Sequence, residues 1–182
     1  MNPPGNDLLL LAGKIITVFM QIAMAFGAVV LIIATGALTF YSDTINAEFI
    51  AESGNPDAVF PIFALFGVML IGLAIVAALF QFFRKLREII KTVSSGDPFE
   101  PANSGRLDQM AWLMLAVQLL VLPAIPLALQ LAKVGEEVGE DIGLNVDGGL
   151  DLSGILLVII LFILARVFRH GTTMRADLEG TV

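Results

Sequence analysis

The sequence predicts an all-α integral membrane protein, a four-helix bundle, and three observations support this fold class. Four apolar stretches, at about 15–40, 58–83, 110–132 and 152–168, contain no acidic residue and no lysine. About 20 such residues in a helix cross the hydrocarbon core of a bilayer, where backbone groups must pair within the helix. Hydrophobic residues make up 57% of the 182 residues and charged residues 15%, too apolar for a soluble domain of this size. The third observation is that the loops between the stretches alternate in charge. We expect one four-helix domain over residues 1–182.

The loop charges predict the orientation of the bundle. The loop after the first stretch contains only acidic charges, and the loop after the third contains six acidic residues against Lys133 alone. Nine of the ten Lys and Arg residues lie instead before the first stretch, between the second and third, or around the end of the fourth. Cytoplasmic loops of membrane proteins are enriched in Lys and Arg. We therefore expect both termini and the central loop to lie in the cytoplasm (N-in/C-in).

The first and fourth stretches differ from an ideal span. Leu8–Leu11 precede Lys14, so the first helix is expected to begin in the membrane interface. The fourth stretch is the shortest, and it can span only if Arg166 extends its guanidinium to the headgroups.

The third stretch contains two prolines, Pro123 and Pro126. Each removes a helical N–H and presses on the preceding turn, which predicts a bend of more than about 20° between Gln118 and Gln130. The backbone freed there is either repaired by neighbouring helices or open to water beside Gln118.

The second stretch continues into a basic segment that includes Arg84, Lys85 and Arg87. Leu86, Ile89, Ile90 and Val93 recur there at helical spacing, with charged residues at the other positions. This pattern predicts an amphipathic cytoplasmic extension of the second helix. The extension either lies on the anionic inner leaflet or accepts a partner helix.

The connection to the third helix has recognisable turn chemistry. Gly96 suits the C-terminal cap of the second helix, and Pro98 prevents that helix from restarting. Asn103 or Ser104 is placed to cap the third helix. Phe99 is a bulky apolar side chain in a polar loop, so we expect it to pack against the inner ends of the helices.

Several chemistries are excluded or disfavoured. There is no Cys, which rules out disulfides and thiolate sites, and the single histidine, His170, cannot supply a bis-histidine haem site. No hydrolase, metalloprotease or phosphate-loop motif is present, so we expect no enzyme and no cofactor. The acids Asp141, Asp147 and Asp151 do not have the spacing of a helix-loop-helix calcium site, so no metal is expected.

Two segments resemble a known family. The first is Gly96-Asp97-Pro98-Phe99 followed by Asn103 and Arg106, and the second is Val167-Phe168-Arg169-His170-Gly171 followed by Met174, Asp177 and Thr181–Val182. Both are similar to the uncharacterised bacterial four-helix membrane family known as domain of unknown function 2975. The resemblance implies a multi-pass protein of the bacterial plasma (inner) membrane. Genes of such proteins often neighbour a small Cro-type helix-turn-helix regulator, which implies a cytoplasmic regulatory partner.

Two classes of function remain consistent with these observations. One is a non-enzymatic membrane sensor or regulator that acts on a cytoplasmic protein such as a helix-turn-helix regulator, with no direct contact to nucleic acid. The alternative is a small channel or transporter subunit, in an oligomer, whose pore is lined by Gln and Thr side chains such as Gln118 and by the backbone freed at Pro123 and Pro126. Small residues recur at helical spacing, as in Ala23 with Gly27, and they serve either packing inside the bundle or a homo-oligomer interface.

Overall fold

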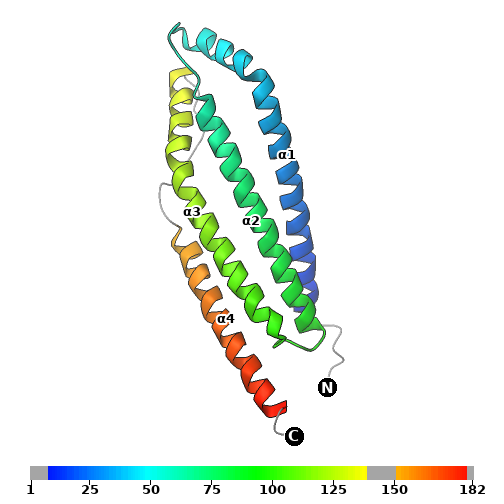
Figure 1. Ribbon diagram of the computed structural model, residues 1–182. Coiled ribbons are helices and arrows are strands. Elements are labelled where there is room, and N and C mark those ends of the chain that lie inside the picture. Colours follow the sequence, from blue (N-terminus) through cyan, green and yellow to red (C-terminus); the bar gives the residue numbers. More distant parts are fainter. Residues whose placement is uncertain (1–7, 139–150, 180–182) are drawn as a thin grey trace. The chain divides into compact units, whose positions relative to one another are not determined.

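The computed structural model describes residues 8–138 and 151–179, and over these ranges it contains four α-helices and no strand (Figure 1). The helices are α1 (Leu8–Ser53), α2 (Ile62–Ser94), α3 (Pro101–Val138) and α4 (Leu152–Glu179). The all-α prediction is therefore confirmed for the described residues.

The helices extend well beyond the apolar stretches at most of their ends. α1 continues through the acidic segment to Ser53, α2 through the basic segment to Ser94, and α4 through the polar tail to Glu179. Hydrophobic runs mark only the part of a helix that suits lipid, whereas the backbone hydrogen bonds continue into polar sequence. The polar segment after residue 168 is the end of α4.

All four helices are long and apolar enough to cross a membrane. Their large apolar side chains lie mainly on the outside: Phe26, Phe40 and Phe63 are 71%, 86% and 87% exposed. A soluble protein rarely exposes so much contiguous apolar surface. Lipid is the solvent that makes this surface favourable, which agrees with a multi-pass membrane protein.

The internal contacts divide the chain into two compact units. Unit 1 comprises the described residues of 1–25, 77–118 and 151–182, and unit 2 those of 26–76 and 119–150. The core of unit 1 joins α2, α3 and α4 through six buried residues: Ile89, Leu107, Met110, Ala111, Leu161 and Ala165.

Unit 2 is held by close helix packing and by a polar contact near the turn between α1 and α2. Gly67 on α2 allows Leu127 on α3 to approach so closely that a Cβ on Gly67 would stand 2.6 Å from its Cδ1 atom. The Asn46 side chain accepts a hydrogen bond from the backbone N–H of Phe60 at 3.0 Å, and the Phe60 ring packs edge-on against Phe49.

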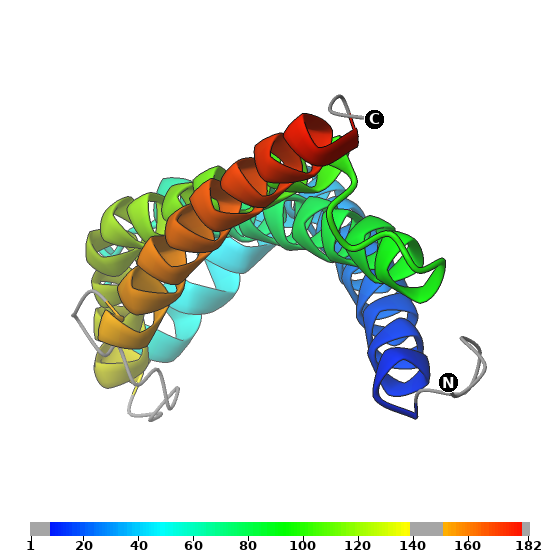
Figure 2. The same cartoon turned by 90° about the horizontal axis from the view of Figure 1, so that it is seen from below.

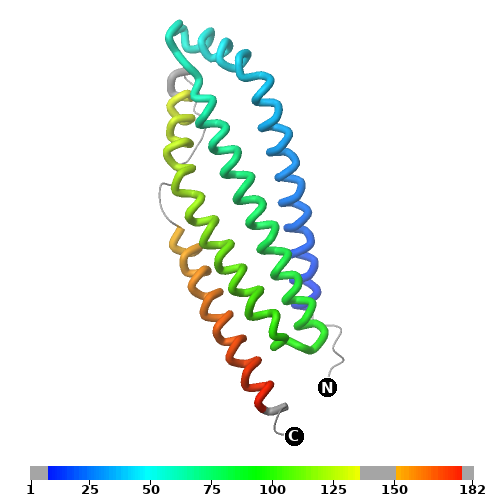
Figure 3. The backbone as a smooth tube through the Cα atoms, in the orientation of Figure 1, coloured from blue at the N-terminus to red at the C-terminus, as the bar shows by residue number. Residues whose placement is uncertain are grey.

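Both prolines of α3 lie inside a helix that continues without a break, and the backbone trace can be followed through this region in Figure 3. Pro123 and Pro126 are exposed. The helix therefore accommodates the lost N–H donors without ending, and the bend of more than about 20° remains a prediction.

Candidate functional site at the polar end of unit 1

The predicted functional residues gather mainly around the linker Ser95–Glu100, which joins α2 to α3 and can be followed in green in Figure 2. We call this linker, together with the ends of α2, α3 and α4 that surround it, the polar end. Its first feature is the cap of α2. Gly96 has φ +88°, its N–H donates to the carbonyl of Val93, and the N–H of Asp97 donates to the carbonyl of Thr92. This pair of bonds is a Schellman motif, so the predicted cap at Gly96 is confirmed.

Asn103 fastens the linker from inside. It is fully buried, and its Nδ2 donates to Thr92 Oγ1 at 2.8 Å and to the Pro98 carbonyl at 3.0 Å. Its Oδ1 accepts a hydrogen bond from Arg106 Nη1 at 2.7 Å. The expectation that Asn103 or Ser104 caps α3 is wrong, because the helix begins earlier, at Pro101, where the missing N–H is harmless. Asn103 instead ties the end of α2, the linker and α3 together.

Phe99 joins the linker to α4. Its ring centroid lies 5.5 Å from that of Phe168, and a Cβ on Gly171 would stand 2.7 Å from its Cε1 atom. Further along, Arg175 Nη1 donates to Asp97 Oδ1 at 2.6 Å. The expectation that Phe99 packs against the ends of helices is confirmed, and Gly171 is small because the ring occupies the space where a side chain would begin.

Charged side chains of α2 and α3 meet at Glu88. Its carboxylate pairs with Arg106 Nε at 3.2 Å, with Arg84 Nε at 3.6 Å and with Lys85 Nζ at 3.8 Å. These groups are partly exposed, so the network adds little to stability but fixes the side chains relative to one another. Arg87 contacts α1 instead: its Nη1 donates to Gln21 Oε1 at 3.3 Å.

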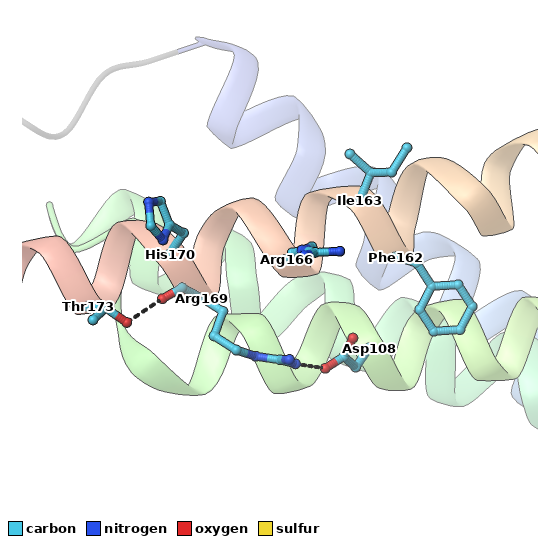
Figure 4. Close-up of a pocket in the computed structure, with 7 residues that line it drawn as sticks. All are labelled: Asp108, Phe162, Ile163, Arg166, Arg169, His170 and Thr173. Carbon is cyan, nitrogen blue, oxygen red and sulfur yellow. Dashed lines mark hydrogen bonds and ion pairs between the residues drawn. The ribbon is translucent and has the colours of Figure 1, made fainter.

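An open pocket of about 740 Å³ lies between α3 and α4 beside the polar end (Figure 4). Arg169 reaches from α4 to an ion pair with Asp108 on α3, and the Thr173 hydroxyl donates to the Arg169 carbonyl. The lining residues are Asp108, Phe162, Ile163, Arg166, Arg169, His170 and Thr173. One part of the wall is apolar and the rest carries cationic and hydrogen-bonding groups.

Gln118 is separate from the polar end. It is 7% exposed, and its Nε2 donates to the backbone carbonyl of Asp151 at 3.2 Å. The Asp151 carboxylate accepts the backbone N–H groups of Ser153 and Gly154, each at 3.0 Å, and thereby caps α4. A Cβ on Gly154 would stand 2.8 Å from Gln118 Cδ. The polar residue of α3 therefore serves a helix–helix contact.

The structure thus assembles most of the predicted residues and leaves some apart. Those in or around the polar end are Arg84, Lys85, Gly96, Pro98, Phe99, Asn103, Arg106, Phe168 and Gly171. Asp177 is exposed on the last turns of α4, and Pro123 and Pro126 belong to unit 2. The acids Asp141 and Asp147 lie outside the described residues.

Sequence reasoning missed three contributors: Glu88, the Asp108–Arg169 pair and the Asp151 cap. The Asp151 cap had a local signal, because an Asp directly before an apolar run is a preferred helix start. The other two join separate helices, and a single sequence does not show which helices are neighbours.

In the part of the chain that the structure describes, no three His, Asp or Glu side chains are grouped to hold a metal ion. The groups of the polar end are guanidinium, carboxylate, amide and aromatic side chains, most of them paired with one another. Such an arrangement suits recognition of a partner or of an anion.

Four helices are able to cross a membrane, and three of them meet at a charged end. These features are typical of multi-pass membrane proteins, and this is the class to which we assign the chain. The chain belongs to the family described as "Protein of unknown function (DUF2975)", whose family model matches residues 45–182. The match begins within α1 and covers both segments on which the resemblance was based. No curated protein and no solved structure matches the chain.

Proposed function

We propose that this chain is a non-enzymatic protein of the bacterial plasma membrane that regulates a cytoplasmic partner through its polar end. The observation that carries the proposal is the contact of Phe99 with Phe168 and Gly171. It joins a linker and a helix that are far apart in the sequence into one surface, while the Phe99 side chain stays 41% exposed. A linker fixed in this way is preorganised, which lowers the conformational entropy that a binding partner must overcome.

The proposal places the polar end in the cytoplasm, with both termini inside. The support is the position of nine of the ten basic residues at this end of the helices or beyond it. The segment from Arg84 to Ser94 is then an amphipathic cytoplasmic extension of α2. In support, Ile89 is buried in the core of unit 1, whereas Arg84 and Lys91 are exposed.

The proposed partner is a small helix-turn-helix regulator, so that DNA is contacted by the partner and not by this chain. The support is the family resemblance together with the ion pairs that hold exposed charges at the polar end. The channel alternative has less support, because its candidate pore residue Gln118 is buried and its amide donates to the first turn of α4.

The test is co-purification of a helix-turn-helix protein encoded beside this gene with the tagged full-length chain in mild detergent. Phe99→Ala should reduce capture strongly while membrane insertion stays intact, because the linker loses its contact with α4. Phe63→Ala is the matched control, since it removes an equally large exposed ring from the other end of α2. Unchanged capture by Phe99→Ala, or a transporter subunit as the neighbouring gene product, would overturn the proposal.

A further inference from the structure

The pocket between α3 and α4 lies where both helices change from apolar to charged sequence. On α3 the uncharged stretch begins just after Asp108, and on α4 it ends just before Arg166. Both residues line the pocket. In a membrane-spanning bundle this transition marks the level of the lipid headgroups, so the pocket opens at that level.

The cationic wall of the pocket includes one arginine that is available to bind an anion. Arg169 is paired with Asp108. Within residues 8–138 and 151–179, Arg166 has no ion pair with a carboxylate, and it is exposed one turn from His170 (Figure 4). An unpaired guanidinium offers a planar fork of N–H donors, which matches the oxygens of a phosphate.

The apolar wall of the pocket continues onto the outer surface of the helices. Phe162 and Ile163 line the pocket, and Ile163 is 58% exposed. Trp112 on α3 packs edge-on against Phe162, with ring centroids 5.6 Å apart. Tryptophan at this level is typical of the interface between headgroups and acyl chains. A water-soluble phosphate compound would leave this wall wet, whereas an acyl chain would cover it.

We propose that this pocket binds an anionic phospholipid, with its phosphate on Arg166 and the start of its acyl chain along Phe162 and Ile163. A net negative headgroup is specified because the positive ammonium of a zwitterionic lipid offsets the attraction of its phosphate to the guanidinium of Arg166. Basic pockets between membrane helices are known to hold anionic headgroups. The inference goes beyond the proposed regulation of a protein partner, and it needs only that this end of α4 lies at a bilayer surface.

The single tryptophan of the chain provides the measurement, because Trp112 contacts the pocket wall. The full-length protein is reconstituted in phosphatidylcholine vesicles with increasing fractions of phosphatidylglycerol brominated on its acyl chain near the headgroup. Quenching of Trp112 fluorescence then gives the affinity of phosphatidylglycerol relative to brominated phosphatidylcholine. We expect a preference for phosphatidylglycerol of about fivefold or more, the contribution of one basic residue near a membrane surface.

Arg166→Gln should bring this ratio close to one, and circular dichroism should show unchanged helix content because Arg166 is exposed. Lys91→Gln is the matched control: it removes one positive charge from an exposed site on α2 that does not line the pocket, so the ratio should stay as in the wild type. Equal quenching by both lipids in the wild type, or an equal loss in the two variants, would overturn the pocket. Loss of the preference on adding inorganic phosphate at constant ionic strength would assign the site to free phosphate and overturn the lipid proposal.

No protein partner is present in this measurement. A failed lipid preference therefore leaves the capture experiment with Phe99→Ala to be judged separately, and the two proposals can fail independently.

Discussion

Gln118 donates a hydrogen bond to the backbone carbonyl of Asp151, 3.2 Å away, and this contact fixes the start of α4 against the middle of the apolar stretch of α3. Ten positions separate Asp108 at the polar end from Gln118, about 15 Å of helix rise. The hydrocarbon core of a bilayer is about 30 Å thick. We therefore expect the first turn of α4, with its acidic cap, to lie within the depth of the bilayer.

Such a position is tolerable because the polar groups of the cap are paired. The Asp151 carboxylate accepts two backbone N–H groups, and its carbonyl accepts bonds from both Ile155 and Gln118. Backbone groups at this depth must be satisfied inside the protein. Gln118 therefore contributes to the structure of α4 by meeting this requirement.

Gly154→Ala should destabilise the protein. The new Cβ would fall on the place of Gln118 Nε2 and stand 2.8 Å from Gln118 Cδ and 3.0 Å from an Asp151 carboxylate oxygen, so the Gln118 amide must move and give up its hydrogen bond to the Asp151 carbonyl. Overpacking of this kind costs about 1–3 kcal/mol, more than the roughly 1 kcal/mol that alanine gains over glycine in a helix. Thermal unfolding in detergent measures it. Gly105→Ala is the control, since a Cβ there meets no atom within 4 Å, and it should be neutral or stabilising.

The depth of the α4 start can be probed with a cysteine at Ser153, which is exposed in the structure. Because the chain has no native cysteine, any labelling reports the introduced site. We expect Ser153→Cys to react with a membrane-impermeant maleimide in vesicles or cells at least about tenfold more slowly than Asp57→Cys, which lies in the turn between α1 and α2. Equal rates would place the start of α4 in water.

The orientation is tested by the same chemistry at the two kinds of loop. Ser95→Cys in the linker should stay unlabelled in intact cells and react after permeabilisation, whereas Asp57→Cys should react in both conditions, because nine of the ten basic residues favour a cytoplasmic polar end. The reverse pattern, or labelling of both in intact cells, would contradict the N-in/C-in arrangement.

The sequence was sufficient for those features that depend on local chemistry. Apolar runs predict four helices, and a glycine followed by a proline predicts the end of α2 at Gly96. The role of Asn103 was predicted wrongly, because its side-chain amide can cap a helix or donate to a distant hydroxyl. Both contacts stabilise a protein by a similar free energy. Only the packing of α2 against α3 brings Thr92 within reach and decides between them.

The same reasoning applies to the contacts of α4. Phe99 was recognisable as a residue that needs a packing surface, but the identity of that surface depends on which helix lies beside the linker. Gly171, 72 positions further on, has no local reason to be a glycine within a helix, where it costs about 1 kcal/mol relative to alanine. Its reason appears only when the Phe99 ring is seen to occupy the space of its side chain.

Asn103→Ala should lower the free energy of unfolding by about 1–3 kcal/mol, the usual cost of leaving buried partners without a hydrogen bond. The Pro98 carbonyl and the Thr92 hydroxyl both lose their donor, and Arg106 loses an acceptor. Gln109→Ala, an exposed position on the same helix, should change stability by no more than about 0.5 kcal/mol. Chemical denaturation in detergent micelles compares the two, and equal midpoints would show that the Asn103 network contributes no stability.

Gly171→Ala tests whether the linker is held by α4. The added Cβ would stand 2.7 Å from Cε1 and 2.8 Å from Cδ1 of Phe99, so the ring must leave its place. Alanine stabilises the helix by about 1 kcal/mol relative to glycine, which offsets part of the overpacking cost, so global stability is an insensitive measure here. Limited proteolysis is sensitive: the linker Ser95–Glu100 should be cleaved several-fold faster, because a displaced Phe99 no longer ties it to Phe168. Gly105→Ala serves again as the control, since it lies on α3 near the linker with open space around its Cβ position, and its cleavage rate should match the wild type.

A Gly171→Ala protein with an unchanged cleavage rate would show that the linker keeps its conformation without the Phe99 contact. The Phe99 contact would then not be the source of the preorganisation on which partner binding is proposed to depend.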